Sequence, residues 1–143
     1  MVEGTVNSKK FKAALEPDGK GSHWFKLDNL EFKSGDDLTL KIKPIKDWSE
    51  PVIPKDLKKE LSTSTQANEV WKSATPMARW DWIRWVRSTK NSETRKKRIK
   101  TACSKLKSGM KRPCCFNRSL CTEPKVCSNG VMIEPKEEAG VKY

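Results

Sequence analysis

The sequence predicts an α+β fold: a small antiparallel β-unit, then a bundle of about four helices and an extended C-terminal tail. Apolar residues alternate with polar ones before residue 46, and they recur every three or four residues after residue 54. The chain of 143 residues suits one compact domain or two small modules that share a core. We therefore expect a β-unit at 1–46, a linker at 47–53, a helical domain at 54–110 and a cysteine-containing tail at 111–143.

The expected β-unit consists of short strands separated by turns. A strand at 10–16 precedes a Pro-Asp-Gly-Lys-Gly turn at 17–21, and a second strand follows at 24–27. After a loop at 29–35, residues 38–43 alternate leucine or isoleucine with threonine or lysine, which predicts a half-buried strand. Such short strands are not stable alone, so we expect them to pack on the helices or on another chain.

Four helices are expected from the changed period and the capping residues. The first runs over 55–61 behind Pro54, and the second runs over 66–73 behind Thr65. Thr75 and Pro76 start a third helix that extends to about residue 88, because threonine is a good cap and proline suits the first helical position.

The fourth helix is expected over 93–107, with Ser92 as its cap and Gly109 as its stop. Glu93 in its first turn and lysines in its last turn both favour the helix dipole. The apolar line of this helix contains Ile99, Ala102, Cys103, Leu106 and Met110. Cys103 is accordingly expected to be an inert core residue.

The third helix has an apolar stripe of about 100° that contains Ala78, Trp82, Trp85 and Val86. We expect Trp85 to be buried against Ile99 and Leu106 of the fourth helix. Trp80 lies on the opposite side with Arg84 and Arg87. Two interpretations of Trp80 stay open: it packs against a neighbouring segment, or it is exposed and stacks on a base.

Basic residues concentrate in one part of the chain. Thirteen lysines and arginines and only two acids lie between Arg79 and Arg112, a net charge of +11 out of the chain's +12. Such a charge predicts salt-sensitive attraction to nucleic acid, anionic lipid or acidic protein, although a solvated face would have the same composition. An exposed basic stripe is predicted on the fourth helix, from Lys96, Lys97, Lys100 and Lys107. Arg95 lies at the edge of the core, and Asp81 is the carboxylate we expect it to bind.

No catalytic residue, metal site or cofactor is predicted. His23 is the single histidine, so one chain cannot assemble a histidine-based metal site or a Ser-His-Asp triad. The tail cysteines Cys114, Cys115, Cys121 and Cys127 do not have the spacing of paired Cys-x-x-Cys zinc ligands. Neither a targeting segment nor a membrane helix is indicated, so we expect a cytoplasmic protein without a disulfide framework.

A family resemblance appears in the helical region. The run contains Thr75-Pro76, Arg79, Trp82, Arg84-Trp85-Val86, Lys90, Glu93-Thr94-Arg95 and Arg98-Ile99. It resembles the YdeI/OmpD-associated family, also called the bacteriocin-protection family, over residues 54–110, with Trp82 where the family usually has tyrosine. In many members a small β-barrel domain precedes these helices, and residues 11–44 look like a shortened version, so the resemblance implies that the β-unit is a partial barrel. The family name implies protection against cationic peptides or bacteriocins, and the resemblance supplies no catalytic residues.

The function expected from these observations is a non-enzymatic binding protein for an anionic partner, with nucleic acid as the leading class. Its expected binding residues are Trp80, Arg84, Arg87, Lys96, Lys97, Lys100 and Lys107. The alternative is a small-ligand-binding or enzymatic stress-response protein with a cleft between the β-unit and the tryptophan-rich helices. A third interpretation is an interaction protein that forms a homodimer through the β-unit, since the turn and strand after Gly35 resemble swapped-hairpin transcription factors.

Overall fold

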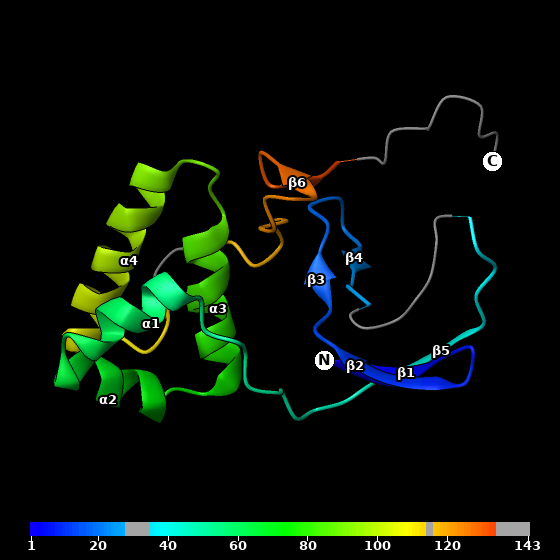
Figure 1. Cartoon of the computed structure of the whole chain (residues 1–143), viewed down its shortest axis with the longest axis horizontal. Helices are drawn as coiled ribbons and strands as arrows, with labels where there is room; N and C mark the ends of the chain where they lie inside the picture. The colour runs from blue at the N-terminus through cyan, green and yellow to red at the C-terminus, as the bar shows by residue number, and fades with distance from the viewer. Residues whose placement is uncertain (28–34, 114–115, 134–143) are drawn as a thin grey trace.

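The computed structural model describes residues 1–27, 35–113 and 116–133. Four helices lie together on one side of the molecule, and the strands lie on the other (Figure 1). Helix α3 is the helix nearest the strands (Figure 1). The predicted α+β class, with a small open antiparallel sheet before four helices, is confirmed.

The helical bundle consists of α1 (Lys55–Ser62), α2 (Thr65–Ser73), α3 (Pro76–Arg87) and α4 (Ser92–Lys107). Helix α4 packs against each of the other three. The core of the bundle lies between them and is formed by Leu57, Leu61, Ala67, Trp71, Trp82, Ile83, Val86, Ile99, Ala102, Cys103 and Leu106.

Two of the predicted helix caps are one residue too late. The Ser64 side chain accepts a hydrogen bond from the Ala67 amide at 3.2 Å, and the Asn91 side chain accepts one from Thr94 at 3.0 Å. Thr65 and Ser92, the predicted caps, are instead the first residues of their helices. In each pair both residues are good caps, and the earlier one has the extended backbone that a cap requires. The predictions for Thr75 as cap and for Gly109, with φ of +95°, as the residue after the last turn are confirmed.

Trp82, rather than Trp85, is the centre of the helical core. The Trp82 side chain is fully buried and its indole nitrogen donates to the Lys111 carbonyl at 2.9 Å. Trp85 is only half-buried, with its ring edge-on to Trp82 at 6.0 Å. The expectation of a buried Trp85 is therefore wrong, because the apolar stripe is wider than the contact with α4, and Trp85 lies at its margin.

The β-unit contains a three-stranded antiparallel sheet in the order β2-β1-β5 and a short β3-β4 pair. Their bounds are β1 (Val2–Val6), β2 (Lys9–Ala13), β3 (Glu16–Pro17), β4 (His23–Trp24) and β5 (Leu40–Pro44). The sequence analysis missed β1, because only two valines mark it within a polar terminus. The strand expected at 10–16 divides into β2 and β3, and most of the loop expected at 29–35 lies outside the described residues.

Strand β5 has the predicted location but not the predicted burial. Leu38, Leu40 and Ile42 are 40–47% exposed, so the expectation of a half-buried strand is wrong. The reason is the position of β5 at the edge of the sheet, where it pairs with β1 alone. Alternation predicts a strand with one apolar face, but it does not predict that another layer covers that face.

Residues 116–133, within the expected tail, include a small folded hairpin. Its strands are β6 (Cys127–Ser128) and β7 (Val131–Met132), and a Cys121–Cys127 disulfide joins its base to the preceding segment. The hairpin docks on the turn between β3 and β4, where the Met132 amide donates to the Asp18 carbonyl at 2.8 Å. The approach is so close that a Cβ at Gly19 would lie 2.0 Å from the Gly130 carbonyl oxygen. A protein without a disulfide framework was expected, and the Cys121–Cys127 disulfide corrects that expectation.

Candidate functional site

A group of charged side chains, of which Glu16, Asp81 and Arg84 are buried, lies where α3 meets the β-unit and the C-terminal hairpin. We call it the Glu16 cluster, and its members are Glu16, Asp81, Arg84, Arg87, Arg118 and Glu123. These side chains come from three segments that are far apart in the sequence: the start of β3, the outer face of α3, and residues 116–133. Three acids and three arginines balance one another, so the cluster has no net charge.

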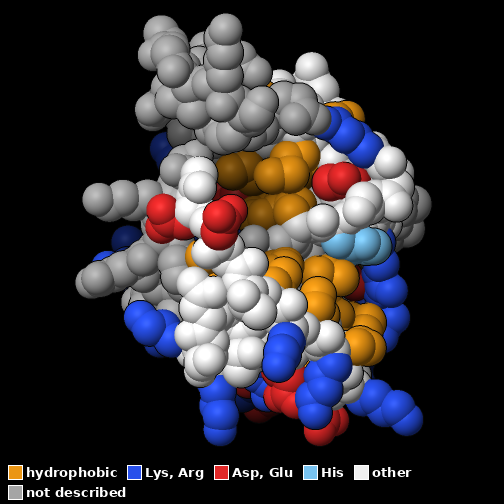
Figure 2. Space-filling view, turned by 90° about the vertical axis from the view of Figure 1, so that its right-hand side faces the viewer, with side chains coloured by type: hydrophobic (Ala, Val, Ile, Leu, Met, Phe, Trp, Pro, Cys, Tyr) orange, Lys and Arg blue, Asp and Glu red, His pale blue; other side chains and the backbone are white. Residues whose placement is uncertain are grey.

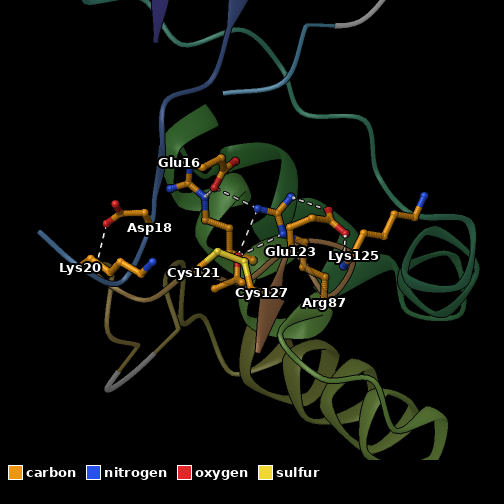
Figure 3. The surroundings of a disulfide bond; sticks show 10 residues. Glu16, Asp18, Lys20, Arg87, Cys121, Glu123, Lys125 and Cys127 are labelled. Atoms are coloured by element: carbon orange, nitrogen blue, oxygen red, sulfur yellow. Dashed lines mark hydrogen bonds and ion pairs between the residues drawn. A yellow bond between two sulfur atoms is a disulfide. The ribbon is translucent and has the colours of Figure 1, made fainter. Parts of the chain in front are cut away.

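Glu16 is the carboxylate that holds the two arginines of α3. Its Oε2 lies 2.9 Å from Arg84 Nε and 2.9 Å from Arg87 Nη2, and the Glu16 and Arg84 side chains are less than 9% exposed. Arg87 also donates to the Thr122 hydroxyl at 3.2 Å and lies 3.8 Å from Glu123 (Figure 3). The Cys121–Cys127 disulfide flanks Thr122 and Glu123 and so fixes the segment that Arg87 contacts (Figure 3).

Asp81 occupies the other end of the cluster. Its Oδ2 accepts a hydrogen bond from Arg118 at 2.6 Å, while its Oδ1 lies 4.0 Å from Arg84 Nη1. The expected pairing of Arg95 with Asp81 is wrong, because Asp81 is on the face of α3 that turns away from α4. Arg95 instead binds Asp56 in α1 through two hydrogen bonds of 2.7 and 3.0 Å. These bonds hold the pKa of the Asp56 carboxyl below its usual value.

Aromatic rings enclose the Arg84 guanidinium. Its central carbon lies 5.7 Å from the centroid of Trp48 and 5.6 Å from that of Trp80, within the range of cation–π attraction. The Trp80 indole nitrogen donates to the Ser49 carbonyl at 3.0 Å. Trp80 thus packs on the linker, which favours the packed interpretation over a ring available to a base.

Four lysines of α4 form an exposed surface that we call the lysine face: Lys96, Lys97, Lys100 and Lys107. All four are exposed, and Lys96 forms a 3.3 Å ion pair with Glu93 one turn earlier. Lys97, Lys100 and Lys107 form no ion pair with the described residues. Arg84 and Arg87 were expected to extend this surface, but they are turned inward to Glu16. That expectation is corrected: the lysine face consists of lysines alone.

No metal centre is formed by the part of the chain that the structure describes. Within residues 1–27, 35–113 and 116–133, no three His, Cys, Asp or Glu side chains are grouped to hold an ion. Of the four tail cysteines that were not expected to bind zinc, Cys114 and Cys115 lie outside the described residues. Cys103 is buried, and burial raises the pKa of its thiol to about 11, as expected for an unreactive core cysteine.

Two cavities border the Glu16 cluster. The larger, about 650 Å³, is a cleft between the sheet and α3, and Phe11, Trp24 and Trp80 contribute its aromatic walls. The smaller, about 230 Å³, lies between the β3-β4 pair and α3 and contacts Asp81 and Arg84 directly. On the face that carries the strands, hydrophobic side chains gather at the centre and basic side chains lie around the margin (Figure 2).

Residues 50–109 match the model of a known family, described as bacteriocin-protection, YdeI or OmpD-associated. The helical region is similar to the YdeI/OmpD-associated family. The predicted resemblance is thereby confirmed over these residues. A search of curated proteins and a search of solved structures found no match. The described part of the chain contains no helix long and apolar enough to cross a membrane.

The residues that carry the YdeI/OmpD-associated resemblance are mainly structural in this chain. Arg98 donates to the Trp85 carbonyl at 2.9 Å, and its guanidinium lies 5.7 Å from the Trp85 ring. Thr94 donates its amide to the cap of α4, and Ile99 is buried in the core. The sequence analysis missed Glu16, Asp81 and Arg118 as members of a site. One signal for Asp81 was available in the sequence. It is the one acidic residue of α3, and Arg84 follows it at a spacing of three residues, which favours an ion pair.

Proposed function

We propose that this protein binds an anionic polymer, with nucleic acid as the leading class, through the lysine face of α4. The observation that carries the proposal is the exposure of Lys97, Lys100 and Lys107 without an acidic partner among the described residues. They recur at intervals of three and seven residues, so they lie along one side of the helix. A row of ammonium groups of this kind attracts a chain of phosphates and displaces its counterions.

The proposed binding is electrostatic and has low sequence specificity. Lysine provides a flexible point charge, whereas base reading uses the planar groups of arginine, asparagine or glutamine. The five arginines within the four helices are held by contacts inside the molecule. Trp80, which the stacking hypothesis required, donates its indole N–H to Ser49. The proposal therefore includes phosphate contacts and excludes base stacking on Trp80.

The test measures binding of fluorescent duplex DNA and single-stranded RNA by anisotropy as a function of salt. If Lys97, Lys100 and Lys107 each neutralise one phosphate of duplex DNA, the logarithm of the association constant falls with a slope of about 3 against the logarithm of salt concentration. The triple variant K97E/K100E/K107E is expected to lose binding at low salt and to keep its helical circular dichroism.

A second triple variant separates a local site from the effect of total charge. K9E/K41E/K46E makes the same change of charge with exposed lysines of the β-unit and its following segment, on the other side of the molecule from α4 (Figure 1). We expect this variant to bind far more tightly than the α4 variant. Equal losses in the two variants, or no binding by the unmodified protein at micromolar concentration and low salt, would refute the proposed site.

A further inference from the structure

Strand β5 leaves one edge of the three-stranded sheet open. It pairs with β1 on one side, and β1 separates it from β2. Just before β5, the Thr39 carbonyl accepts a hydrogen bond from the Asn7 amide at 2.9 Å. Because bonded and non-bonded pairs alternate along an antiparallel ladder, the odd-numbered residues of β5 bond to β1. The backbone N–H and C=O groups of Leu40 and Ile42 therefore point away from the sheet.

The outer edge of β5 offers both backbone groups and apolar side chains to a partner. The outward groups of Leu40 and Ile42 have no hydrogen-bond partner among the residues that the structure describes. The side chains of the same two residues are 45% and 47% exposed, and Leu38 before them is 40% exposed. An open row of backbone groups beside exposed apolar side chains is a template for the addition of a further strand.

The polar face of the same sheet is basic. Residues that lie opposite one another in an antiparallel pair share a face. Four exposed lysines therefore share the face of Glu3 and Thr5, because each of them lies opposite one of these two residues of β1: Lys10, Lys12, Lys41 and Lys43. Glu3 forms a 3.3 Å ion pair with Lys43. A strand added beside β5 would place its own polar side chains next to Lys41 and Lys43.

These lysines determine which strand the edge accepts. A second copy of the chain, paired through β5 by two-fold symmetry, would place lysines opposite lysines, and like charges in that position are destabilising. A nucleic acid would contact the lysines but would leave the backbone groups and the apolar side chains unused.

A strand with alternating side chains uses all three features of the edge. Its backbone bonds to the outward groups of Leu40 and Ile42, its apolar side chains cover theirs, and its carboxylates lie beside Lys41 and Lys43. We infer that the outer edge of β5 binds an extended segment of a partner protein in which acidic and apolar residues alternate. This surface is separate from the lysine face, because β5 lies on the other side of the molecule from α4 (Figure 1).

The test uses a fluorescent peptide that alternates glutamate with valine, and a lysine–valine peptide of the same length. Anisotropy with the full chain should show saturable binding of the glutamate peptide and at least about tenfold weaker binding of the lysine peptide. Amide hydrogen exchange, measured by NMR, should slow at Leu40 and Ile42 when the glutamate peptide binds, because both amides then donate to it. No binding, equal binding of the two peptides, or unchanged exchange at both amides would overturn the inference.

Two variants at one position separate strand addition from side-chain contact. Ile42→Pro removes an outward N–H and leaves the bonds to β1, and proline is tolerated on an edge strand where its nitrogen faces solvent, as Pro44 already does two residues later. It should abolish binding of the glutamate peptide. Ile42→Ala also removes apolar surface but keeps the N–H, so it should still bind. Equal binding by the two folded variants would show that no backbone pairing occurs and would overturn the inference.

A charge reversal on each edge of the sheet locates the peptide even if Ile42→Pro does not fold. Lys41 of β5 and Lys10 of β2 are matched, because both are exposed and both lie opposite Thr5. Lys41→Glu should weaken binding of the glutamate peptide about fivefold or more, and Lys10→Glu should weaken it clearly less. Equal losses would show that the total charge of the sheet holds the peptide. That result, or a dimer with Leu40 and Ile42 already protected from exchange without peptide, would overturn the inference.

Discussion

At the residue scale, arginine and lysine have separate roles in this protein. Each of the five arginines in the helices forms an ion pair or a hydrogen bond inside the molecule, whereas the four lysines of the lysine face are exposed to solvent. Arginine suits buried pairing because its guanidinium is planar, weakly hydrated and donates in two directions. The charge of +11 between residues 79 and 112 is therefore larger than the charge available to a partner.

Trp82 should contribute far more to stability than its neighbour Trp85. Trp82 has no exposed surface and packs at the centre of the core, so Trp82→Ala should lower the free energy of unfolding by about 3–5 kcal/mol. Trp85→Ala removes a half-buried ring at the margin and should cost clearly less. Urea unfolding of both variants measures the difference, and equal losses would show that the core is not centred on Trp82.

The burial and contacts of a residue could be predicted from the sequence only where they depend on local spacing. Helical spacing places Ile99, Cys103 and Leu106 on one buried line, and the structure agrees. The partner of Arg95 was predicted wrongly, because periodicity gives the face of a side chain but not which acid in a distant helix lies opposite. Asp56 is 39 residues earlier in the chain, and only the packing of α1 on α4 brings it to Arg95.

At the element scale, helices were predicted better than strands, because their signals are local in the sequence. The helices were predicted to within a residue or two, because caps and a regular period are local properties. Strand β5 was predicted as a strand, but its exposure depends on what covers the sheet. Strand β1 was missed because a five-residue segment with a central glycine carries little signal, although it is the middle strand of the sheet.

The ion pair between Asp56 of α1 and Arg95 of α4 should make a small, pH-dependent contribution to stability. Arg95 lowers the pKa of Asp56 below 3.8, so the folded state favours the ionised carboxylate. This contribution is complete above the unfolded pKa and disappears as pH falls through the folded pKa. Because the Asp56 side chain is 48% exposed, solvent screening limits it to about 1 kcal/mol or less.

Comparison of the unmodified protein with Asp56→Asn tests the contribution of this ion pair to stability. Urea unfolding at pH 6 should show a stability difference of about 0.5–1 kcal/mol, and the difference should shrink as the pH falls below about 4. A pH-independent difference would mean that the side chain acts by its shape or by its hydrogen bond to Leu57 rather than by its charge.

At the scale of the whole molecule, the Glu16 cluster joins parts that the sequence presents as separate segments. The β-unit supplies Glu16, α3 supplies three charged side chains, and the C-terminal hairpin supplies Arg118 and Glu123. Hydrophobic periodicity predicted a β-unit and a helical bundle, but not this junction, because a buried ion pair requires the docked geometry of both partners. The small cavity between the β3-β4 pair and α3 could not be predicted for the same reason, since its walls come from segments far apart in the sequence.

Glu16 should therefore be the acid on which the docking of the β-unit most depends. Glu16→Gln keeps the shape but leaves Arg84 and Arg87 without the carboxylate they share, and breaking a buried pair in this way costs about 3–5 kcal/mol. Glu50→Gln is the matched control, because Glu50 also pairs with an arginine of α3 but its side chain is 64% exposed, which limits the loss to about 1 kcal/mol. Urea unfolding measures both losses, and amide hydrogen exchange should show faster opening at β3 and the hairpin in Glu16→Gln only. If the two variants lose the same small amount, the β-unit is held to α3 by its apolar contacts, and the arginines of the cluster are satisfied without Glu16.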